Sequence, residues 1–176
     1  MPHKDNPQYL ADMSFGFGEE DRILPFLEER FGKLKKLDKY NPFDFENEEF
    51  IIEVKSRRIP HNKYKTLMFN YTKLEKLEVM DTKKRAIFIF NCDDGIYGWE
   101  YDTTEFFVGR GGRCDRGCNE YSRMAYVGID KLFDIEAMPI FNVARGTSGG
   151  EKNEDDSCCK RLRRSIKKNI TSTDKV

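Results

Sequence analysis

The chain has 176 residues, the usual size of one domain and enough to bury a hydrophobic core. Lysine plus arginine number 31 and aspartate plus glutamate number 31, so the net charge is zero and the overall charge gives no support for nucleic-acid binding. Charged residues make up 35% of the chain, but 38% are hydrophobic and 13% aromatic, which excludes a wholly disordered protein.

The N-terminal stretch MPHKDNPQYLADMSFGFG lacks a sustained apolar run, and no segment approaches the roughly 20 apolar residues that span a bilayer. We therefore expect neither a secretory leader nor a membrane partner. The five cysteines are an odd number, which favours free thiols over a disulfide framework. Together these features predict an intracellular protein in a reducing compartment.

The N-terminal part of the chain predicts a polar arm followed by a helix. Residues 1–14 contain two prolines and mostly polar side chains, so we expect a mobile arm there. In residues 15–34 the apolar side chains recur at helical spacing, and Gly32 closes the pattern. Pro25 fits a helix only in its first turn, so the helix is expected to begin after Glu19 or to be kinked at the proline.

The middle of the chain predicts mostly strands. Apolar alternation and short apolar runs mark the strands, and helical spacing of Leu67, Tyr71, Leu74 and Leu77 marks one helix. The expected elements, in chain order, are strands at 33–38, 43–46 and 50–56, a helix at 66–80, strands at 85–92 and 96–102 joined by an Asp94-Gly95 turn, a Gly/Arg loop at 109–120, a strand at 122–129, a short helix or turn at 130–138 and an edge strand at 139–144.

From Arg145 the composition changes, because almost no apolar residues follow. We interpret 145–176 as a disordered charged tail, and 15–144 as the folded domain. The run KRLRRSIKK at 160–168 is typical of nuclear targeting or of nonspecific DNA contact, and equally of a solvated charged segment.

The stretch FDFENEEFIIEVKSRR at 43–58 places charged residues inside a strongly apolar strand pair. If the apolar faces coincide, Phe45 lies opposite Phe50 and Asp44 lies opposite Ile51. A slip of one residue would bury the charge of Asp44 among apolar side chains. Strand alternation then gives one apolar face and one charged face, formed respectively by Phe50, Ile52 and Val54, and by Ile51, Glu53 and Lys55 together with Asp44.

This register makes Asp44 and Glu53 diagonal neighbours, with Cβ atoms about 7 Å apart. Two carboxylates with open positions suit Mg²⁺ (or Mn²⁺), which keeps several waters and accepts phosphate oxygens. Lys55 on the same face would orient a water or steady a phosphate, so the set suits hydrolysis of a phosphodiester. The alternative is a surface cluster of salt bridges between Lys55 and the two carboxylates.

FDF followed by IIEVKSRR resembles the PD-(D/E)XK nuclease-like superfamily, which includes restriction endonucleases and Holliday-junction resolvases. It more closely resembles the short nuclease-like proteins of large DNA viruses, in which a helix of the type GEEDRILPFLEERFG precedes such a strand pair. The resemblance covers about residues 15–130. It implies an α/β fold with a restriction-endonuclease-like αβββαβ core, in which helices flank a central mixed sheet. It also implies a metal-dependent endonuclease or exonuclease acting on DNA, resolvase-like or repair-like, in the cytoplasm or nucleus of a host.

The resemblance also implies roles for individual residues. Asp44 and Glu53 would bind the metal, with the carbonyl of Val54 as a further ligand, and Lys55 would assist the attacking water. A glutamate of the first helix would complete the catalytic and metal site. Glu20 is our choice for this position and Glu19 is the alternative.

One departure from the family pattern is the proline, because Pro42 is one residue further from Asp44 than the motif has it. The proline is not a ligand in the family, so the departure does not affect the expected metal set.

Four basic residues are candidates for contact with nucleic acid: Arg57, Lys73, Arg110 and Arg113. Lys73 lies in the expected second helix, where the family often has a lysine or glutamine that points at the site. Arg110 and Arg113 lie among glycines that permit close backbone approach to a phosphate. The alternative for each is an ordinary surface side chain.

Cysteines 114, 118, 158 and 159 do not have the spacing of a zinc site, because the second pair is adjacent, and we expect no zinc. The leading hypothesis is therefore a Mg²⁺-dependent DNA nuclease, which would act as a homodimer on symmetric substrates. The alternatives are a catalytically inactive nucleic-acid-binding or scaffold protein on the same fold, and a structural protein with a charged surface hairpin.

Overall fold

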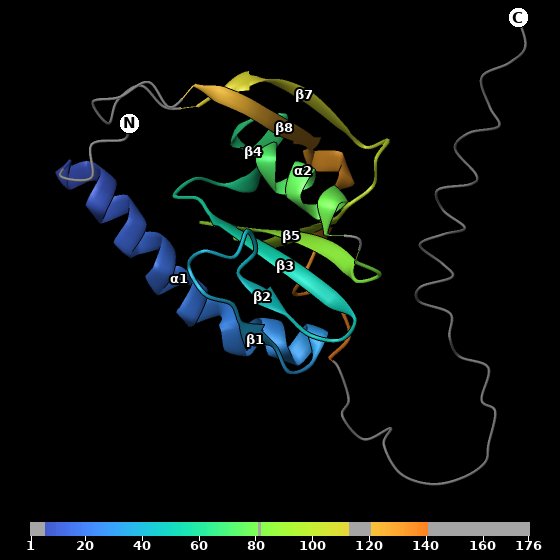
Figure 1. Cartoon of the computed structure of the whole chain (residues 1–176). Helices are drawn as coiled ribbons and strands as arrows, with labels where there is room; N and C mark the ends of the chain where they lie inside the picture. The colour runs from blue at the N-terminus through green and yellow to red at the C-terminus, as the bar shows by residue number, and fades with distance from the viewer. Residues whose placement is uncertain (1–5, 81, 113–120, 141–176) are drawn as a thin grey trace, which may run out of the picture. The chain divides into compact units, whose positions relative to one another are not determined.

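The computed structural model describes residues 6–80, 82–112 and 121–140 (Figure 1). Within these residues no helix combines the length and the apolar character that crossing a membrane requires. The elements of the described chain are α1 (Pro7–Phe31), β1 (Lys35–Lys36), β2 (Phe45–Glu46), β3 (Phe50–Ser56), the 3-10 turn η1 (His61–Lys63), β4 (Thr66–Asn70), α2 (Thr72–Val79), β5 (Arg85–Cys92), β6 (Gly95–Glu100), β7 (Phe106–Gly111), β8 (Ser122–Gly128), the 3-10 turn η2 (Ile129–Lys131) and β9 (Phe133–Asp134).

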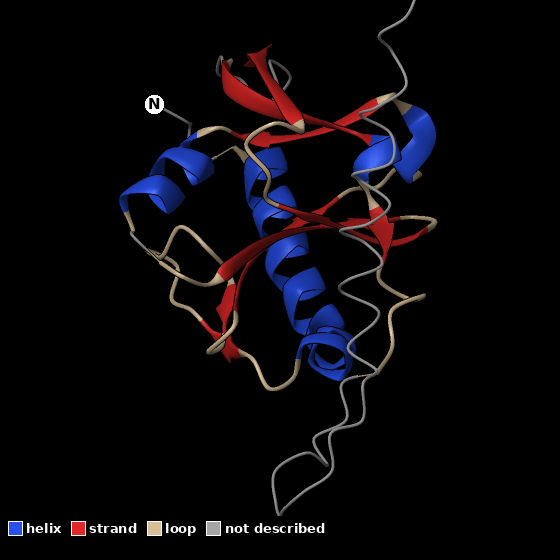
Figure 2. Cartoon of the chain, turned by 90° about the vertical axis from the view of Figure 1, so that its right-hand side faces the viewer, coloured by secondary structure: helices blue, strands red, loops and turns tan. Residues whose placement is uncertain are grey.

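The strands form two sheets. The larger sheet has six strands in the order β1-β2-β3-β5-β6-β9, and the smaller sheet has three in the order β4-β8-β7. Only the β3–β5 pair is parallel among the described strand pairs, so the large sheet is mixed and the small one antiparallel. In the turned view of Figure 2 the small sheet forms a layer separate from the large one. The fold is therefore mixed α/β, as the sequence predicts.

One face of the large sheet is covered by α1 (Figure 1). Alternate side chains of the strands point to this face and meet the apolar side of the helix. The packing holds the C-terminal half of α1 along β3. The buried cluster on this side comprises Ile23, Leu27, Phe31, Leu34, Phe45, Phe50, Ile52, Val54, Ile87, Ile89 and Ile135.

The opposite face is covered by α2 and the small sheet. Phe69 of β4 stacks on Phe88 of β5 with ring centroids 4.1 Å apart, which joins the two sheets. Ile51 of β3 points to this side, and so does Glu53, two residues later in the same strand. The buried cluster here comprises Phe43, Ile51, Leu67, Phe69, Leu74, Leu77, Ala86, Phe88, Phe90, Cys92, Trp99, Ala125 and Val127.

The first helix differs from its prediction at its N-terminus. Asn6 caps the helix, because its side-chain oxygen accepts hydrogen bonds from the backbone N–H groups of Gln8 at 2.9 Å and Tyr9 at 3.1 Å. Pro7 occupies the first turn, where no intrahelical donor is lost. The expected arm at 1–14 is therefore helical from Pro7 onward, and Pro25 lies inside α1 without ending it.

The expected helix at 66–80 is two elements. Residues 66–70 form β4, in which Leu67 and Phe69 alternate into the core, and only Thr72–Val79 are helical. The side chain of Asn70 accepts hydrogen bonds from the N–H and hydroxyl of Thr72 and so marks the change. The four-residue spacing of Leu67 and Tyr71 fits a helix, but Leu67 belongs to the strand that precedes it. That coincidence of spacing produced the wrong prediction.

Smaller differences occur further along the chain. The Gly/Arg loop expected at 109–120 begins later, because residues up to Gly111 belong to β7. The turn between β5 and β6 is Asp93-Asp94, since Cys92 pairs with Gly95. The edge strand is β9 instead of residues 139–144, of which 139 and 140 form no strand. The remainder of that segment and the expected tail lie outside the described residues.

The contact between α1 and the sheet gives a test of the fold. Leu27 is 0% exposed, whereas Leu10 on the same helix is 53% exposed. We expect Leu27→Ala to lower the free energy of unfolding by about 2–5 kcal/mol, because a cavity replaces core contacts. The control Leu10→Ala should change it by less than about 0.5 kcal/mol. Urea unfolding followed by circular dichroism measures both, and equal effects would contradict the placement of α1.

Candidate functional site

The β2–β3 hairpin has a different register from the predicted one. Phe45 pairs with Ile52, and not with Phe50. Asn47 forms the turn, because its N–H donates to the carbonyl of Phe50 at 3.0 Å and its side-chain oxygen accepts from the N–H of Phe50 at 2.7 Å. The centre of the turn therefore lies one residue later in the chain than predicted, and the register shifts by two residues. Because a shift of two preserves strand faces, Asp44 stays on the face of Glu53 and Lys55.

The shift brings the two carboxylates together across the hairpin. Asp44 lies one residue before the paired Phe45, so it is beside Glu53 and not opposite Ile51. Its Oδ2 accepts a hydrogen bond from the backbone N–H of Val54 at 2.7 Å. Asp44 therefore lies directly across the hairpin from Glu53, and the two residues are not diagonal neighbours as predicted.

Asp44 and Glu53 lie where one edge of β3 has no neighbouring strand among the described strands, which we call the open edge of β3. In the described chain β2 pairs with β3 only as far as Ile52, whereas β5 continues beside β3 to Ser56. In an extended strand the N–H and C=O of one residue point to the same side. The carbonyl of Val54 therefore faces the edge at which its N–H meets Asp44. Three oxygen groups, those of Asp44, Glu53 and Val54, belong to this edge.

The carboxylate of Glu53 is buried between two lysines. Its side chain is 0% exposed, and Lys73 of α2 donates a hydrogen bond to Oε2 at 2.7 Å. Lys73 also donates to the carbonyl of Pro42, two residues before Asp44. The ammonium of Lys55 lies 2.5 Å from Oε1, the other oxygen of this carboxylate. Each oxygen of Glu53 thus has one lysine ammonium beside it.

The surroundings of the site raise two pKa values. The pKa of Asp44 is raised to about 7, because burial and the charge of Glu53 outweigh the opposing effects of the Val54 hydrogen bond and the charge of Lys55. Burial lowers the pKa of Lys55, but the charge and hydrogen bonding of Glu53 and the charge of Asp44 outweigh it, so the net pKa is raised. Near neutral pH Lys55 is a cation, and Asp44 is close to the midpoint of its titration.

The first helix brings Glu20, and not Glu19, toward this cluster. Burial raises the pKa of Glu20, and the charges of Lys55 and Glu53 act on it, as does that of Lys36. Glu19 is engaged elsewhere, because Arg22 lies 2.6 Å from its carboxylate and Asn91 donates to it at 2.7 Å. The charges of the cluster therefore act on Glu20, whereas the partners of Glu19 are Arg22 and Asn91.

The predicted nucleic-acid contacts lie in different places. Lys73 is at the carboxylates, whereas the guanidinium of Arg57 donates to the carbonyl of Met68 at 2.6 Å and braces β4. Arg110 is exposed on β7, with its guanidinium carbon 5.9 Å from the centre of the Tyr121 ring. Arg113 lies outside the described residues. Lys73 is therefore the one of the described three that the structure joins to the carboxylates.

Sequence reasoning missed two polar residues near the site. Lys36 pairs with Glu20, with 3.5 Å between Nζ and Oε2, and nothing in the sequence marks it. Asn91 is buried at the end of β5 and donates to Ser56, at the end of β3, at 3.1 Å. A polar residue ending the apolar run RAIFIF was the available signal for Asn91.

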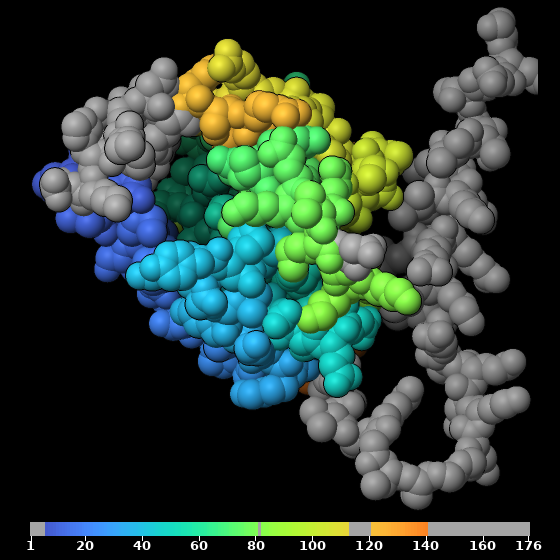
Figure 3. Space-filling view, viewed as in Figure 1, coloured from blue at the N-terminus to red at the C-terminus, as the bar shows by residue number. Residues whose placement is uncertain are grey.

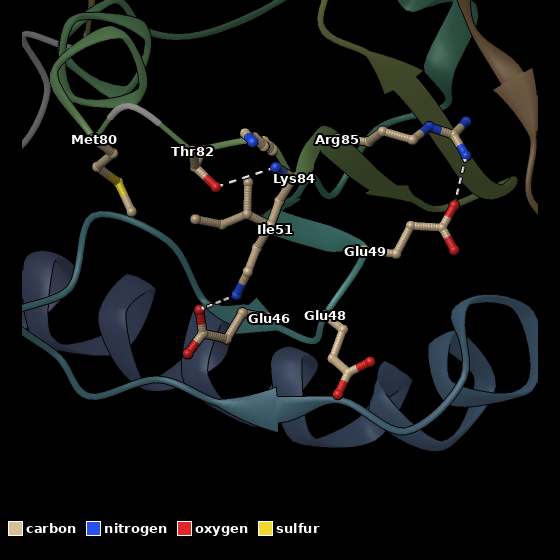
Figure 4. A pocket seen from close by; sticks show the side chains of 9 residues that line it. Glu46, Glu48, Glu49, Ile51, Met80, Thr82, Lys84 and Arg85 are labelled. Carbon is tan, nitrogen blue, oxygen red and sulfur yellow. Dashed lines mark hydrogen bonds and ion pairs between the residues drawn. The ribbon is translucent and has the colours of Figure 1, made fainter.

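The surface is hollowed between α1 and α2, the helices that supply Glu20 and Lys73 (Figure 3). A different pocket lies at the opposite end of β3 (Figure 4). Four of its charged side chains form ion pairs with one another, because Lys84 lies 2.8 Å from Glu46 and Arg85 lies 3.1 Å from Glu49. We therefore place the candidate site at the open edge of β3 and not in that pocket.

No group of three or more His, Cys, Asp or Glu side chains in the described residues is arranged to hold a metal ion. Any metal at this edge would therefore rely on a backbone carbonyl and waters as well as on carboxylates. Cys92 is a buried free thiol whose pKa burial raises to about 11. The four cysteines weighed as zinc ligands lie outside the described residues.

The raised pKa of Asp44 predicts how stability depends on pH. Between pH 4 and pH 7 the unfolded carboxyl ionises while the folded one stays protonated, so stability should fall as pH rises. Asp44→Asn keeps an oxygen for the Val54 N–H and carries no charge. In EDTA we expect this variant to be more stable than the wild type at pH 8 and nearly equal at pH 4.5. Urea unfolding at both pH values tests this, and equal stability at pH 8 would contradict it.

Comparison with protein-family models, with curated proteins and with solved structures finds no match to this chain. The function proposed for it therefore depends on its own residues and their geometry.

Proposed function

We propose that the chain is a metal-dependent nuclease that hydrolyses phosphodiester bonds in DNA. The observation that carries the proposal is the meeting of Asp44 and Glu53 at an open strand edge, with Lys55 on the same face. The carboxylate of Glu53 is fully buried, whereas the carboxylates of a surface salt-bridge cluster are exposed to water. The arrangement thus favours a working site over the surface salt-bridge cluster that the sequence left as an alternative.

The oxygens of this edge fit a hard divalent cation. Mg²⁺ is commonly bound through one or two carboxylates and otherwise by waters and phosphate oxygens. Asp44 and Glu53 would hold it with the carbonyl of Val54, and the buried carboxylate of Glu53 already lies between two cations, Lys55 and Lys73. When bound, Mg²⁺ supplies Lewis-acid polarisation of the phosphoryl group and a more acidic water. Glu20 would act from α1, either as a ligand or through a water.

Lys55 would provide the positive charge next to the reacting phosphate. Its ammonium is partly exposed and lies on the same face as both carboxylates. An ammonium at this place donates hydrogen bonds, so it can orient the attacking water or neutralise a phosphate oxygen. These roles agree with those that the resemblance to the PD-(D/E)XK superfamily implies.

The order of elements supports the same proposal. α1, β1, β2, β3, α2 and β5 follow one another as in an αβββαβ core, with β4 inserted before α2. The parallel β3–β5 pair places both strand ends at one edge, where ligands commonly bind in α/β sheets. We propose on this basis that the fold is restriction-endonuclease-like.

A second candidate function is a catalytically inactive DNA-binding or scaffold protein on the same fold. The observation that favours it is the pair of lysines at Glu53, because they compensate its charge without any metal. In that case the cluster would only stabilise the hairpin.

Cleavage assays separate these functions. We expect the protein to cut duplex, branched or single-stranded DNA in Mg²⁺ or Mn²⁺ and not in EDTA. Asp44→Ala and Lys55→Ala should each lower the rate about 100-fold or more, because each removes a group at the reacting phosphate. Lys84→Ala is the matched control, since it breaks the ion pair with Glu46 at the other end of the hairpin. Its rate should stay near that of the wild type.

Cleavage that persists in both site variants would sink the nuclease proposal. Metal-independent binding of DNA without any cleavage would instead support the inactive protein.

The placement of Glu20 gives a further prediction. Glu20→Gln should weaken Mn²⁺ binding about tenfold, as loss of a group that supports a metal site commonly does. Glu19→Gln should have little effect, because Glu19 binds Arg22 and Asn91. Isothermal titration calorimetry without DNA measures both affinities. An effect of Glu19→Gln equal to or larger than that of Glu20→Gln would show that Glu20 has no special place in the site.

A further inference from the structure

Lys73 makes two contacts that join separate parts of the site. Its ammonium donates to Oε2 of Glu53 at 2.7 Å and to the carbonyl of Pro42. Pro42 precedes Asp44 by two residues, and Glu53 lies in β3. The lysine therefore bridges the segment that carries one carboxylate to the strand that carries the other.

The position of Lys73 is set by the packing of its helix. Leu74 is fully buried and Leu77 nearly so, which holds α2 against the large sheet and points the lysine at the strand edge. Side-chain exposure is 21% for Lys73 and 0% for Glu53, so the ion pair is largely shielded from water. A buried carboxylate without a cation is strongly unfavourable. Lys73 thus does in the metal-free protein what a bound cation would otherwise do.

We propose that Lys73 is a resident cation that occupies the metal-binding face of Glu53 and competes with Mg²⁺ for the site. This inference rests on the proposed function, because it concerns the same carboxylates. It assigns Lys73 a role as a competitor and positioning residue and not primarily as a contact to DNA.

The competition has a defined consequence. A metal that binds Glu53 through Oε2 must displace Lys73 from that oxygen, so the affinity measured for the wild type is lowered by that contact. A phosphate near α2 would offer Lys73 another partner and free Oε2. Binding of substrate and binding of metal are then coupled through one side chain.

Metal affinity in the absence of DNA tests the proposal. Lys73→Met keeps most of the aliphatic stem and removes the charge. We expect it to bind Mn²⁺ and Mg²⁺ about tenfold or more tightly than the wild type at pH 8, since a lost charge-assisted hydrogen bond no longer opposes the metal. Lys76→Met is the matched control, because Lys76 is an exposed lysine of the same helix. Isothermal titration calorimetry measures each affinity, and circular dichroism confirms folding.

The outcomes separate this inference from the proposed function. Tighter metal binding by Lys73→Met, with wild-type affinity in Lys76→Met, supports the competition. Equal or weaker binding in that variant, with wild-type binding abolished by Asp44→Asn, overturns the competition and leaves the nuclease proposal standing. Absence of metal binding from both the wild type and Lys73→Met overturns both.

A second measurement uses the wild-type chain and does not depend on any variant folding. Reductive methylation followed by mass spectrometry reports how freely each lysine amine reacts. We expect Mg²⁺ to speed the modification of Lys73 several-fold, because its ammonium is released from Glu53 and from the Pro42 carbonyl. The rate at Lys76 should stay constant. A Lys73 rate that Mg²⁺ leaves unchanged would overturn the inference.

Discussion

The buried charge of Glu53 is the constraint on which the rest of the candidate site depends. Removing a carboxylate from water costs on the order of several kcal/mol unless cations and hydrogen-bond donors surround it. Lys55 comes from the same strand, but Lys73 comes from α2, so the docking of that helix and the charge on β3 stabilise each other. The apolar residues of α2 therefore hold a charged group in place as well as filling a core.

The early end of β2 leaves room for the side chain of Asp44 beside β3. Had the hairpin continued pairing past Ile52, backbone hydrogen bonds would have filled the edge where Asp44 now accepts from Val54. α1 and α2 cover opposite faces of the sheet, yet both reach this edge, one with Glu20 and the other with Lys73. A short strand thus lets two layers of the fold contribute to one place.

The sequence predicted the strands near the site well and the geometry of the hairpin less well. The spans 50–56 and 85–92 agree with β3 and β5, because long apolar runs leave few alternatives. Matching Phe45 with Phe50 conserved the faces but not the register, since a shift of two residues leaves the apolar pattern unchanged. The register depends on the side chain of Asn47, which accepts a hydrogen bond from the backbone of the turn, and the apolar pattern contains no sign of that contact. The contact of Lys73 with Pro42 depends on tertiary packing, which no periodicity encodes.

The closeness of Asp44 and Glu53 also bears on how the chain folds. Like charges placed together across two strands destabilise a hairpin, and only Lys55 among the compensating lysines at Glu53 belongs to it. Lys73 follows Glu53 by 20 residues and arrives only when α2 has docked. The isolated hairpin is therefore a poor folding nucleus at neutral pH. The charged edge makes the hairpin and α2 form together, so the site adds cooperativity to the folding of the domain that contains it.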